Sequence, residues 1–237
     1  EINILKRLDH PNIVKGYDSF NWGKKNVAIV MEHCEGGDLY SRTPYSERDA
    51  SKIVSQILSA VHYMHSKEIM HRDIKYENIL FEKTTHDSKI KIIDFGLSKM
   101  IKENNELSND MAGTLYSMAP EVLEGGHSFE ADMWSIGVVT FMLLSNKFPF
   151  GRRKWRLVIQ RIKKCDYSFN YHSWRHVSNQ GREFVSSLIK LDPNERLNTW
   201  QALYSPWLQA EHKQLLDTDK RGQQRSDSRA WGTNPIQ

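Results

Sequence analysis

The stretch of sequence that decides the fold is His71-Arg72-Asp73-Ile74-Lys75-Tyr76-Glu77-Asn78, which precedes Asp94-Phe95-Gly96 further along the chain. Two short runs with β-strand character, residues 79–81 and 90–93, lie between them and are separated by a charged turn. We expect these runs to pair as a β-hairpin. The hairpin would place the end of the first stretch beside the start of the second, so that two polar loops meet.

Asp73, Asn78 and Asp94 would then lie close together, and their side chains suit one kind of chemistry. One carboxylate can orient a hydroxyl group and accept its proton, while a second carboxylate and an amide oxygen hold Mg²⁺ against phosphates, as phosphoryl transfer requires. A third motif, Ala119-Pro120-Glu121, follows. Any one of these motifs recurs by chance, but the three in this order predict a phosphoryl-transfer site.

The composition is that of a globular intracellular protein. The 237 residues are 39% hydrophobic, and the net charge of +4 gives no reason to expect a nucleic-acid or membrane partner. Only two cysteines occur, far apart and without metal-ligand spacing, which suits a reducing compartment such as the cytoplasm. The longest apolar stretch, residues 134–144, is too short to span a bilayer. No Asp-x-Asp-x-Asp-Gly loop occurs, so calcium binding by this chain has no support.

The spacing of apolar residues predicts an α+β fold that becomes entirely helical after residue 130. The chain opens with helical spacing, after which Ile13-Val14 and residues 27–30 indicate two strands joined by a turn at residues 21–23. Ser46, with Asp49 three residues later, predicts the N-cap of a long helix. Further helices are expected over residues 132–144, around Trp155, Val158, Ile159 and Ile162, and around Phe184 to Ile189.

With these motifs together, the chain resembles a eukaryotic serine/threonine protein kinase of the calcium/calmodulin-dependent group, most of all the plant and protist calcium-dependent kinases. The resemblance covers residues 1–208. It implies a two-lobed fold with a partial N-lobe and hinge in residues 1–35 and a complete helical C-lobe in residues 36–208. The polar, aperiodic residues 209–237 are expected to be disordered.

The resemblance assigns a role to each catalytic residue. Asp73 would be the catalytic base, Lys75 would contact the transferring phosphate, and Asn78 and Asp94 would bind Mg²⁺. Lys75 and the pair Gly113-Thr114 suit a serine/threonine kinase. ATP and Mg²⁺ would be the cofactors and proteins with serine or threonine acceptors the substrates, while regulation by calcium/calmodulin is compatible with the group but not visible in this chain. The alternative is a kinase fold whose loops serve only as a scaffold.

A nucleotide site is implied in the same way. Met31 would be the gatekeeper behind the adenine, and Glu32 to Cys34 would form the hinge whose backbone groups bind the adenine edge. Asp38 would reach the ribose or a basic substrate residue, or would cap a helix, and the two roles are compatible. The other positions assigned to this site are Leu80, Glu77 and Glu1, the last of which matches the helix glutamate that pairs with a lysine.

Other positions would support the catalytic loops without taking part in the chemistry. Glu121 and Arg196 match the buried ion pair that fixes the activation segment, and Asp132 would bond the backbone of the catalytic loop. The residues expected to pack together in the family's regulatory spine are His71, Phe95 and Leu5.

The chain departs from the family pattern in several places. No Gly-x-Gly-x-x-Gly loop occurs and no Val-Ala-Ile-Lys strand precedes Glu1. We therefore expect weak ATP binding and slow turnover unless a longer protein supplies both elements, because positioning of the phosphates supplies most of the catalysis. Gly16 stands where the spine usually has a leucine, which predicts looser packing. Tyr76 replaces the usual proline of the catalytic loop, with little effect expected.

Substrate choice and regulation are predicted from a few charged positions. Glu77 and Asp38 should favour arginine or lysine about two to three residues before the acceptor, through charge-assisted hydrogen bonds. The lip formed by Leu115, Tyr116 and Met118 should favour an apolar residue just after it. Asp110 stands where a phosphorylated residue of the activation loop would be. A carboxylate there could pair permanently with Arg72, which predicts activity without activation-loop phosphorylation. The alternative is an exposed aspartate of little effect.

Two more segments allow more than one interpretation. The basic cluster in residues 152–164 is interpreted as the solvated face of an amphipathic helix rather than as a nucleic-acid site, since its apolar residues keep helical spacing. In the polar tail, Leu215-Leu216 and Trp231 would suit an autoinhibitory element, with plain disorder as the alternative.

Overall fold

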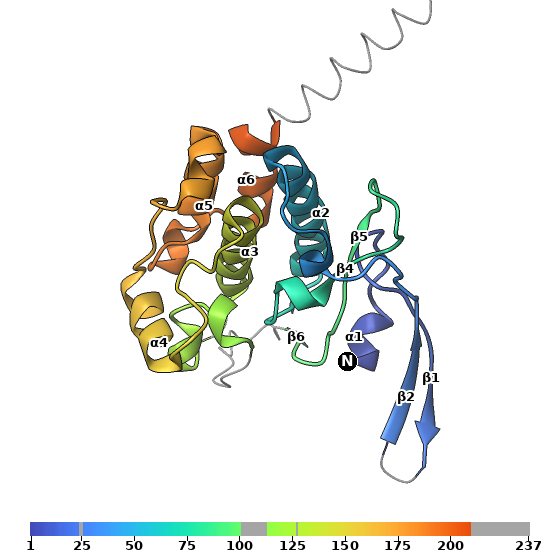
Figure 1. Ribbon diagram of the computed structural model, residues 1–237. Helices are drawn as coiled ribbons and strands as arrows, with labels where there is room; N and C mark the ends of the chain where they lie inside the picture. Colours follow the sequence, from blue (N-terminus) through green and yellow to red (C-terminus); the bar gives the residue numbers. More distant parts are fainter. Residues whose placement is uncertain (24–25, 101–112, 127, 210–237) are drawn as a thin grey trace, which may run out of the picture.

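The computed structural model describes residues 1–23, 26–100, 113–126 and 128–209 of the chain. A small N-terminal part and a larger helical part make up the fold (Figure 1). The small part holds the short helix α1 (Ile2–Leu5) and the strands β1 (Gly16–Trp22) and β2 (Asn26–Met31), which form an antiparallel hairpin. This hairpin extends away from the helices, and the arrangement agrees with the expected two-lobed fold with a partial N-lobe.

The first strand does not lie where the sequence placed it. Ile13 and Val14 are 2% and 3% exposed, and they precede β1. Ile13 forms a parallel bridge with Ile92, and the Val14 amide donates to the Ile92 carbonyl at 3.0 Å. The apolar pair thus joins the N-terminal part to the helical part. The turn expected at residues 21–23 was also wrong in part, because β1 continues through Trp22.

The larger part contains five α-helices, four short strands and six short 3₁₀ segments among its described residues. The helices are α2 (Glu47–Ser66), α3 (Phe129–Ser145), α4 (Trp155–Lys164), α5 (Asn179–Leu188) and α6 (Thr199–Leu203). The strands are β3 (Ile69–Met70), β4 (Ile79–Phe81), β5 (Ile90–Ile92) and β6 (Lys99–Met100), with β4 paired to β5 and β3 to β6. The 3₁₀ segments are η1 (Leu39–Arg42), η2 (Tyr76–Asn78), η3 (Leu115–Ser117), η4 (Val122–Glu124), η5 (His172–His176) and η6 (Pro193–Glu195).

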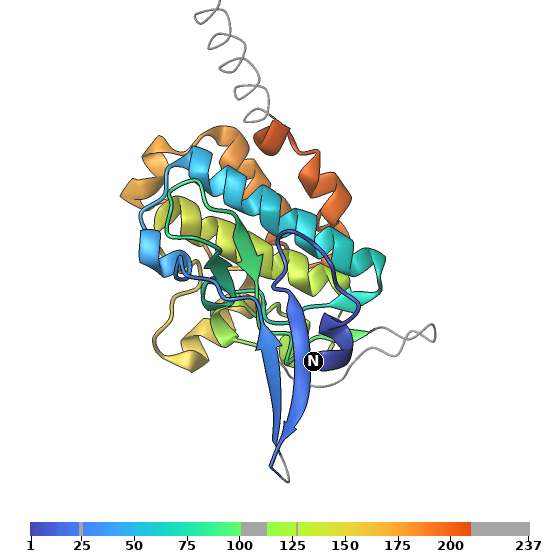
Figure 2. The same cartoon turned by 90° about the vertical axis from the view of Figure 1, so that its right-hand side faces the viewer.

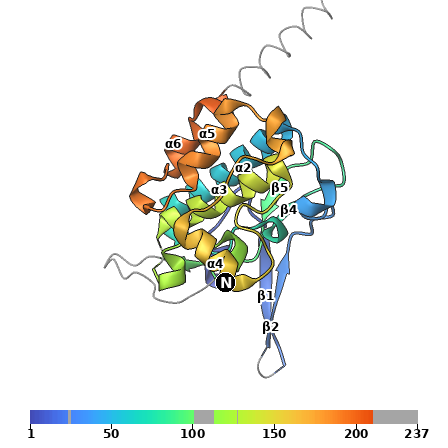
Figure 3. The same ribbon diagram turned by 60° about the vertical axis from the view of Figure 1, so that its left-hand side comes forward.

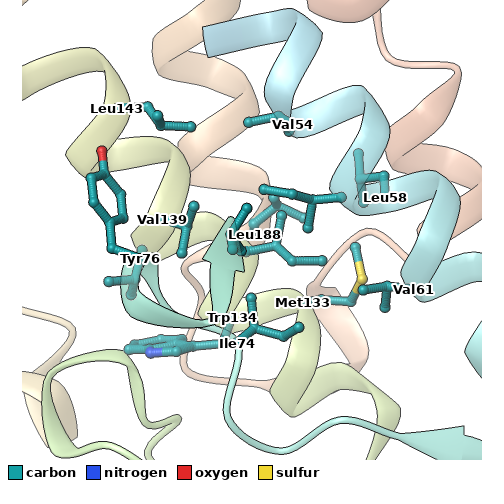
Figure 4. Close-up of a cluster of buried hydrophobic side chains, with 14 of the residues drawn as sticks. Val54, Leu58, Val61, Ile74, Tyr76, Met133, Trp134, Val139, Leu143 and Leu188 are labelled. Carbon is teal, nitrogen blue, oxygen red and sulfur yellow. The ribbon is translucent and has the colours of Figure 1, made fainter. Parts of the chain in front are cut away.

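Helices α2 and α3 run side by side through the core (Figure 2). The predicted cap of α2 is confirmed, because the Ser46 hydroxyl accepts a hydrogen bond from the Asp49 amide at 3.1 Å. In Figure 4, Val54 and Leu58 of α2 and Val139 of α3 belong to one buried cluster. Helix α3 is buried from Ala131 to Ser145, as its nearly continuous apolar sequence predicts. No helix among the described residues is long and apolar enough to cross a membrane.

Replacement of Gly137 by alanine is expected to destabilise this core. Gly137 lies inside α3, and a Cβ there would lie 2.7 Å from Ile189 Cγ1 and 2.9 Å from Leu188 Cβ. The gain in helix propensity is about 1 kcal/mol, whereas overpacking costs about 1–3 kcal/mol. We expect a lower midpoint in urea unfolding. Gly126→Ala is the matched control, since its Cβ would approach no atom closer than 3.4 Å; equal midpoints for the two variants would contradict the packing argument.

Glu47, the first residue of α2, connects three helical segments. Its carboxylate accepts hydrogen bonds from the Ser178 amide at 2.9 Å and from the Ser178 hydroxyl at 2.6 Å. It also accepts one from the Trp207 indole nitrogen at 2.9 Å. Ser178 in turn caps α5 through the Gly181 amide. One acidic side chain therefore holds the start of α2, the start of α5 and the end of the described chain together.

Candidate active site

The β4–β5 hairpin brings the two polar loops together, as the sequence predicts. Ile79 pairs with Ile92, and Phe81 pairs with Ile90. Just past the pairing, the Ile93 amide donates to the Asn78 carbonyl at 2.9 Å. Asn78 and Asp94 therefore lie at the same end of the hairpin.

Asp73 is the centre of a hydrogen-bond network. Lys75 Nζ lies 2.5 Å from Asp73 Oδ2 and 2.8 Å from the hydroxyl oxygen of Thr114. The side-chain amide of Asn78 donates to Asp73 Oδ2 at 3.1 Å and to the Asp73 carbonyl at 2.9 Å. Three of the four predicted catalytic residues are thus in direct contact. The part played by Thr114 was missed, although Gly113-Thr114 had marked the kinase class.

The second carboxylate oxygen of Asp73 lacks a partner in the described part of the chain. Asp73 is 5% exposed, and its Oδ1 is buried without a hydrogen bond. A buried carboxylate oxygen without a donor is costly and therefore uncommon. The network therefore engages Oδ2 and leaves the hydrogen-bond capacity of Oδ1 unused.

Asp94 is exposed beside a buried neighbour. It adopts a left-handed backbone conformation with φ of 63°, and its Oδ1 accepts a hydrogen bond from the Gly96 amide at 3.3 Å. Phe95 is fully buried, and its ring centroid lies 5.1 Å from that of His71. This confirms the expected packing of His71 with Phe95, and Leu5 belongs to the same core. Burial of Phe95 therefore holds the loop while the Asp94 carboxylate stays accessible.

The Asp132 carboxylate binds the backbone of the catalytic loop, as predicted. Its carboxylate accepts hydrogen bonds from the His71 amide at 3.0 Å and the Arg72 amide at 2.9 Å. His65 Nε2 lies 2.9 Å from the same carboxylate; this partner in the last turn of α2 was not foreseen. Burial alone would raise the pKa of Asp132, but the bonds to His65 and to the His71 backbone outweigh it and hold the pKa below its ordinary value.

The predicted ion pair between Glu121 and Arg196 is also confirmed. It is bidentate, with nitrogen–oxygen distances of 2.6 and 2.8 Å, and the Arg196 side chain is fully buried. Arg196 donates further hydrogen bonds to the carbonyls of Lys190, Glu130 and Leu191. The guanidinium therefore ties the segment after Ala119-Pro120 to the loop before α6.

The predicted nucleotide residues come from the end of β2, the segment after it and β4. Met31 ends β2 and is 40% exposed. The Glu32 side chain pairs with Lys91 at 2.8 Å and its amide donates to the Lys15 carbonyl at 2.8 Å, so its backbone carbonyl is the group left for a ligand. Burial raises the pKa of the half-buried Cys34 thiol. Leu80 is the outward residue of β4, between two buried neighbours.

Glu1, Asp38 and Glu77 complete the predicted set. Glu1 is exposed at the start of α1, and a Cβ on Gly96 would lie 3.9 Å from its carboxylate. Asp38 accepts a hydrogen bond from the Ser41 amide at 3.2 Å, which confirms its capping role at η1. Glu77 accepts a hydrogen bond from the Tyr116 hydroxyl, a contact that sequence spacing does not indicate.

Two of the departures from the family pattern have visible consequences. A cavity of about 60 Å³ is lined by Gly16 and Leu5, in agreement with the looser packing expected at Gly16. The Tyr76 ring is buried, with its centroid 4.9 Å from that of Tyr40. The bulkier Tyr76 side chain is thus accommodated between η1 and η2, which pack against each other. The predictions for Asp110, for Leu215-Leu216 and for Trp231 lie outside the described residues.

Comparison with known proteins agrees with this geometry. The family model of the protein kinase domain matches residues 1–208, and the chain belongs to this family. A CDPK-related protein kinase of Daucus carota is 41% identical over 214 residues, which are 88% of this chain and 35% of that protein.

Two further relatives are calcium/calmodulin-dependent kinases by name. The calcium/calmodulin-dependent serine/threonine-protein kinase 1 of Oryza sativa subsp. japonica is 40% identical over 225 residues, 92% of this chain and 37% of that protein. The human calcium/calmodulin-dependent protein kinase type IV is 41% identical over 225 residues, 92% of this chain and 47% of that protein. The chain spans between about a third and a half of the length of these relatives.

Proposed function

We propose that the protein transfers a phosphoryl group from ATP to serine or threonine hydroxyls of proteins. The observation that carries this proposal is the Asp73 carboxylate, whose Oδ2 is held by the ammonium group of Lys75 at 2.5 Å while its Oδ1 has no hydrogen bond within the described residues. A carboxylate that is held on one oxygen and free on the other can orient an incoming hydroxyl and take its proton. The adjacent cation stabilises negative charge that develops on the transferring group.

The residues at the hairpin end fit Mg²⁺. The Asn78 amide nitrogen is engaged by Asp73, so its amide oxygen is the group left for a metal, and the Asp94 carboxylate is exposed. Mg²⁺ prefers such oxygen ligands and usually takes only one or two carboxylates, with phosphates and water completing the shell. Residues 1–100, 113–126 and 128–209, apart from 24 and 25, contain no cluster of three acidic, histidine or cysteine side chains suited to a metal.

In this mechanism the chain positions the reactants, and the cofactor supplies the group to be transferred. Bound ATP with Mg²⁺ would provide the phosphoryl group and shield its charge. Asp73 would accept the proton of the substrate hydroxyl, and Lys75, which donates a hydrogen bond to Thr114, would neutralise charge on the reacting phosphate. Asp132 keeps the loop in shape by holding two of its amides.

A nucleotide-dependent shift in thermal unfolding tests this proposal. A non-hydrolysable ATP analogue at about 100 times its Kd stabilises a protein by about 2.7 kcal/mol. We expect a rise in Tm that requires Mg²⁺ and is lost in Asp94→Asn. The matched control Asp87→Asn, in the exposed β4–β5 turn, should keep the shift. A protein that shows no Mg²⁺-dependent shift would instead be the scaffold.

We propose further that the acceptor site favours basic residues before the serine or threonine. Asp38 caps η1 and Glu77 lies in η2, and these two segments pack together. In this proposal their two carboxylates receive the basic residues. Glu77→Gln should reduce the preference for arginine in a positional peptide library, with an effect of about 1.5–3 kcal/mol for one hydrogen bond to a charged group. Glu68→Gln, at an exposed position just past the C-terminal end of α2, is the control. An unchanged arginine preference in Glu77→Gln would contradict the assignment.

A further inference from the structure

The exposed start of α4 differs from its predicted form. Residues 152–157, here called the basic-aromatic patch, are Arg152, Arg153, Lys154, Trp155, Arg156 and Leu157, and all six are exposed. The sequence placed Trp155 on the buried face with Val158 and Ile162. Those two are 2% and 0% exposed, but Trp155 is 60% and Leu157 is 41% exposed. The helix therefore presents two large apolar side chains among four cations, which a merely solvated face does not require.

The cations of the patch lie apart from the acids that neutralise the rest of α4. The ion pairs of this helix within the described residues are Lys163 with Glu124 at 3.1 Å and Arg161 with Asp166 at 4.0 Å, both toward its end. In the patch, Arg152 lies over the Phe148 ring and Arg156 over the Trp155 ring, each at 5.3 Å. Contacts with rings order the guanidinium groups and leave their charge in place.

The electrostatics of the helix end add to this excess of charge. Lys154, the N-cap of α4, has φ of 61° and makes no side-chain capping bond, and the first turn contains no acid. A helix N-terminus carries a partial positive charge, so cations there are unfavourable. An acidic partner would relieve both repulsions at once. The patch is thus complementary to negative charge combined with an apolar side chain.

The patch is continuous with the acceptor side of the active site. Helix α4 contacts η3, and both lie in the same region of Figures 1 and 3. Tyr116 of η3 donates a hydrogen bond to Glu77, and its ring packs edge-on against Phe148 with a centroid distance of 5.0 Å. Arg152 covers the same Phe148 ring. A row of contacts therefore leads from Glu77 to the patch.

We propose that the basic-aromatic patch binds an acidic segment of the protein substrate, with an apolar side chain of that segment against Trp155. This proposal rests on the proposed kinase function, because it assumes a substrate bound at Glu77, where the row of contacts to the patch begins. The acidic segment lies outside the few residues around the acceptor, where Glu77 and Asp38 favour positive charge. A protein is favoured over a membrane surface because the patch extends the lip on which the substrate lies.

The direct test measures binding to the full-length protein without nucleotide. The probe is a fluorescent peptide with a run of glutamates and one leucine, and the same peptide with glutamines is its control. We expect the double variant Arg153→Glu/Arg156→Glu to bind it about 10-fold more weakly, at the lower end of the effect of electrostatic steering. Acids at the start of α4 favour its dipole, so this variant should fold at least as well as the native protein. Lys83→Glu/Lys89→Glu, an exposed pair in the β4–β5 turn, matches the charge change.

A kinetic test connects the patch to substrates. The KM of a basic acceptor peptide should fall when a flexible linker joins the peptide to the glutamate segment. In the Arg153→Glu/Arg156→Glu variant the linked segment should no longer lower the KM, while the short peptide is phosphorylated normally. Equal binding of the probe by the two double variants would overturn the proposal. The proposal would also be overturned if the protein bound phosphatidylserine vesicles through Arg153 and Arg156 but did not bind the peptide. The binding test does not depend on turnover. Failure of the kinase proposal would therefore be detected separately, as a lack of phosphorylation of the short peptide.

Discussion

Replacement of Asp73 by asparagine is expected to lower the rate of phosphoryl transfer in the full-length protein by about 10²–10⁴-fold. Asparagine keeps the shape of the side chain and one acceptor oxygen, but it cannot take the proton of the substrate hydroxyl. The loss should appear in kcat measured with a saturating acceptor peptide, while KM for the peptide changes little. Asp87→Asn, in the exposed β4–β5 turn, is the control for a lost surface charge.

The companion variant Asp94→Asn should fail for a different reason. It removes the only carboxylate proposed as a metal ligand, so turnover should need far more Mg²⁺ than in the native protein. Titration of kcat against Mg²⁺ separates the two variants, because Asp73→Asn should keep the native dependence. Native turnover in Asp94→Asn at ordinary Mg²⁺ would refute the site.

Replacement of Arg196 by alanine is expected to cost about 3–5 kcal/mol of folding stability, the usual effect of removing one partner of a buried ion pair. The Glu121 carboxylate, with a side chain 20% exposed, would lose both of its bonds to the guanidinium. Three backbone carbonyls would lose a donor as well. Chemical denaturation at neutral pH gives the free energy of unfolding directly.

Lys163→Ala is the matched control for Arg196→Ala. It breaks a pair with Glu124 at 3.1 Å whose side chains are 47% and 69% exposed, so about 0–1 kcal/mol should be lost. The double variant Glu121→Leu/Arg196→Met should recover part of the stability, because no charge is then left buried, but not all of it, because the carbonyls remain unbonded. A loss in Arg196→Ala no larger than in Lys163→Ala would show that the pair contributes little.

The sequence predicts well those features that depend on short spacing or on a strong motif. The cap at Ser46, the buried length of α3 and the β4–β5 hairpin follow from local patterns, and the structure contains all three. The Glu121–Arg196 pair joins residues 75 positions apart, and only the resemblance to a family indicated it. The roles of Asp73, Lys75, Asn78 and Asp94 remain proposals that the geometry supports.

The features that the sequence missed depend on packing between distant segments. Ile13 and Val14 have strand character, but their partner is the edge of β5 rather than β2, and an apolar pair does not specify its neighbour. Trp155 keeps helical spacing with Val158, yet no segment in the described part of the chain covers it. The bond from Tyr116 to Glu77 depends on how η3 folds back over the catalytic loop.

The contacts of Glu47 with Ser178 and Trp207 also determine the order in which this protein can mature on the ribosome. These residues are 131 and 160 positions downstream. At a synthesis rate of about 5–20 residues per second, Glu47 waits roughly 8–32 s for Trp207 to be added. Until then, α2 cannot make its contacts with these downstream segments. The helical lobe can therefore complete its packing only after Trp207 has been synthesised.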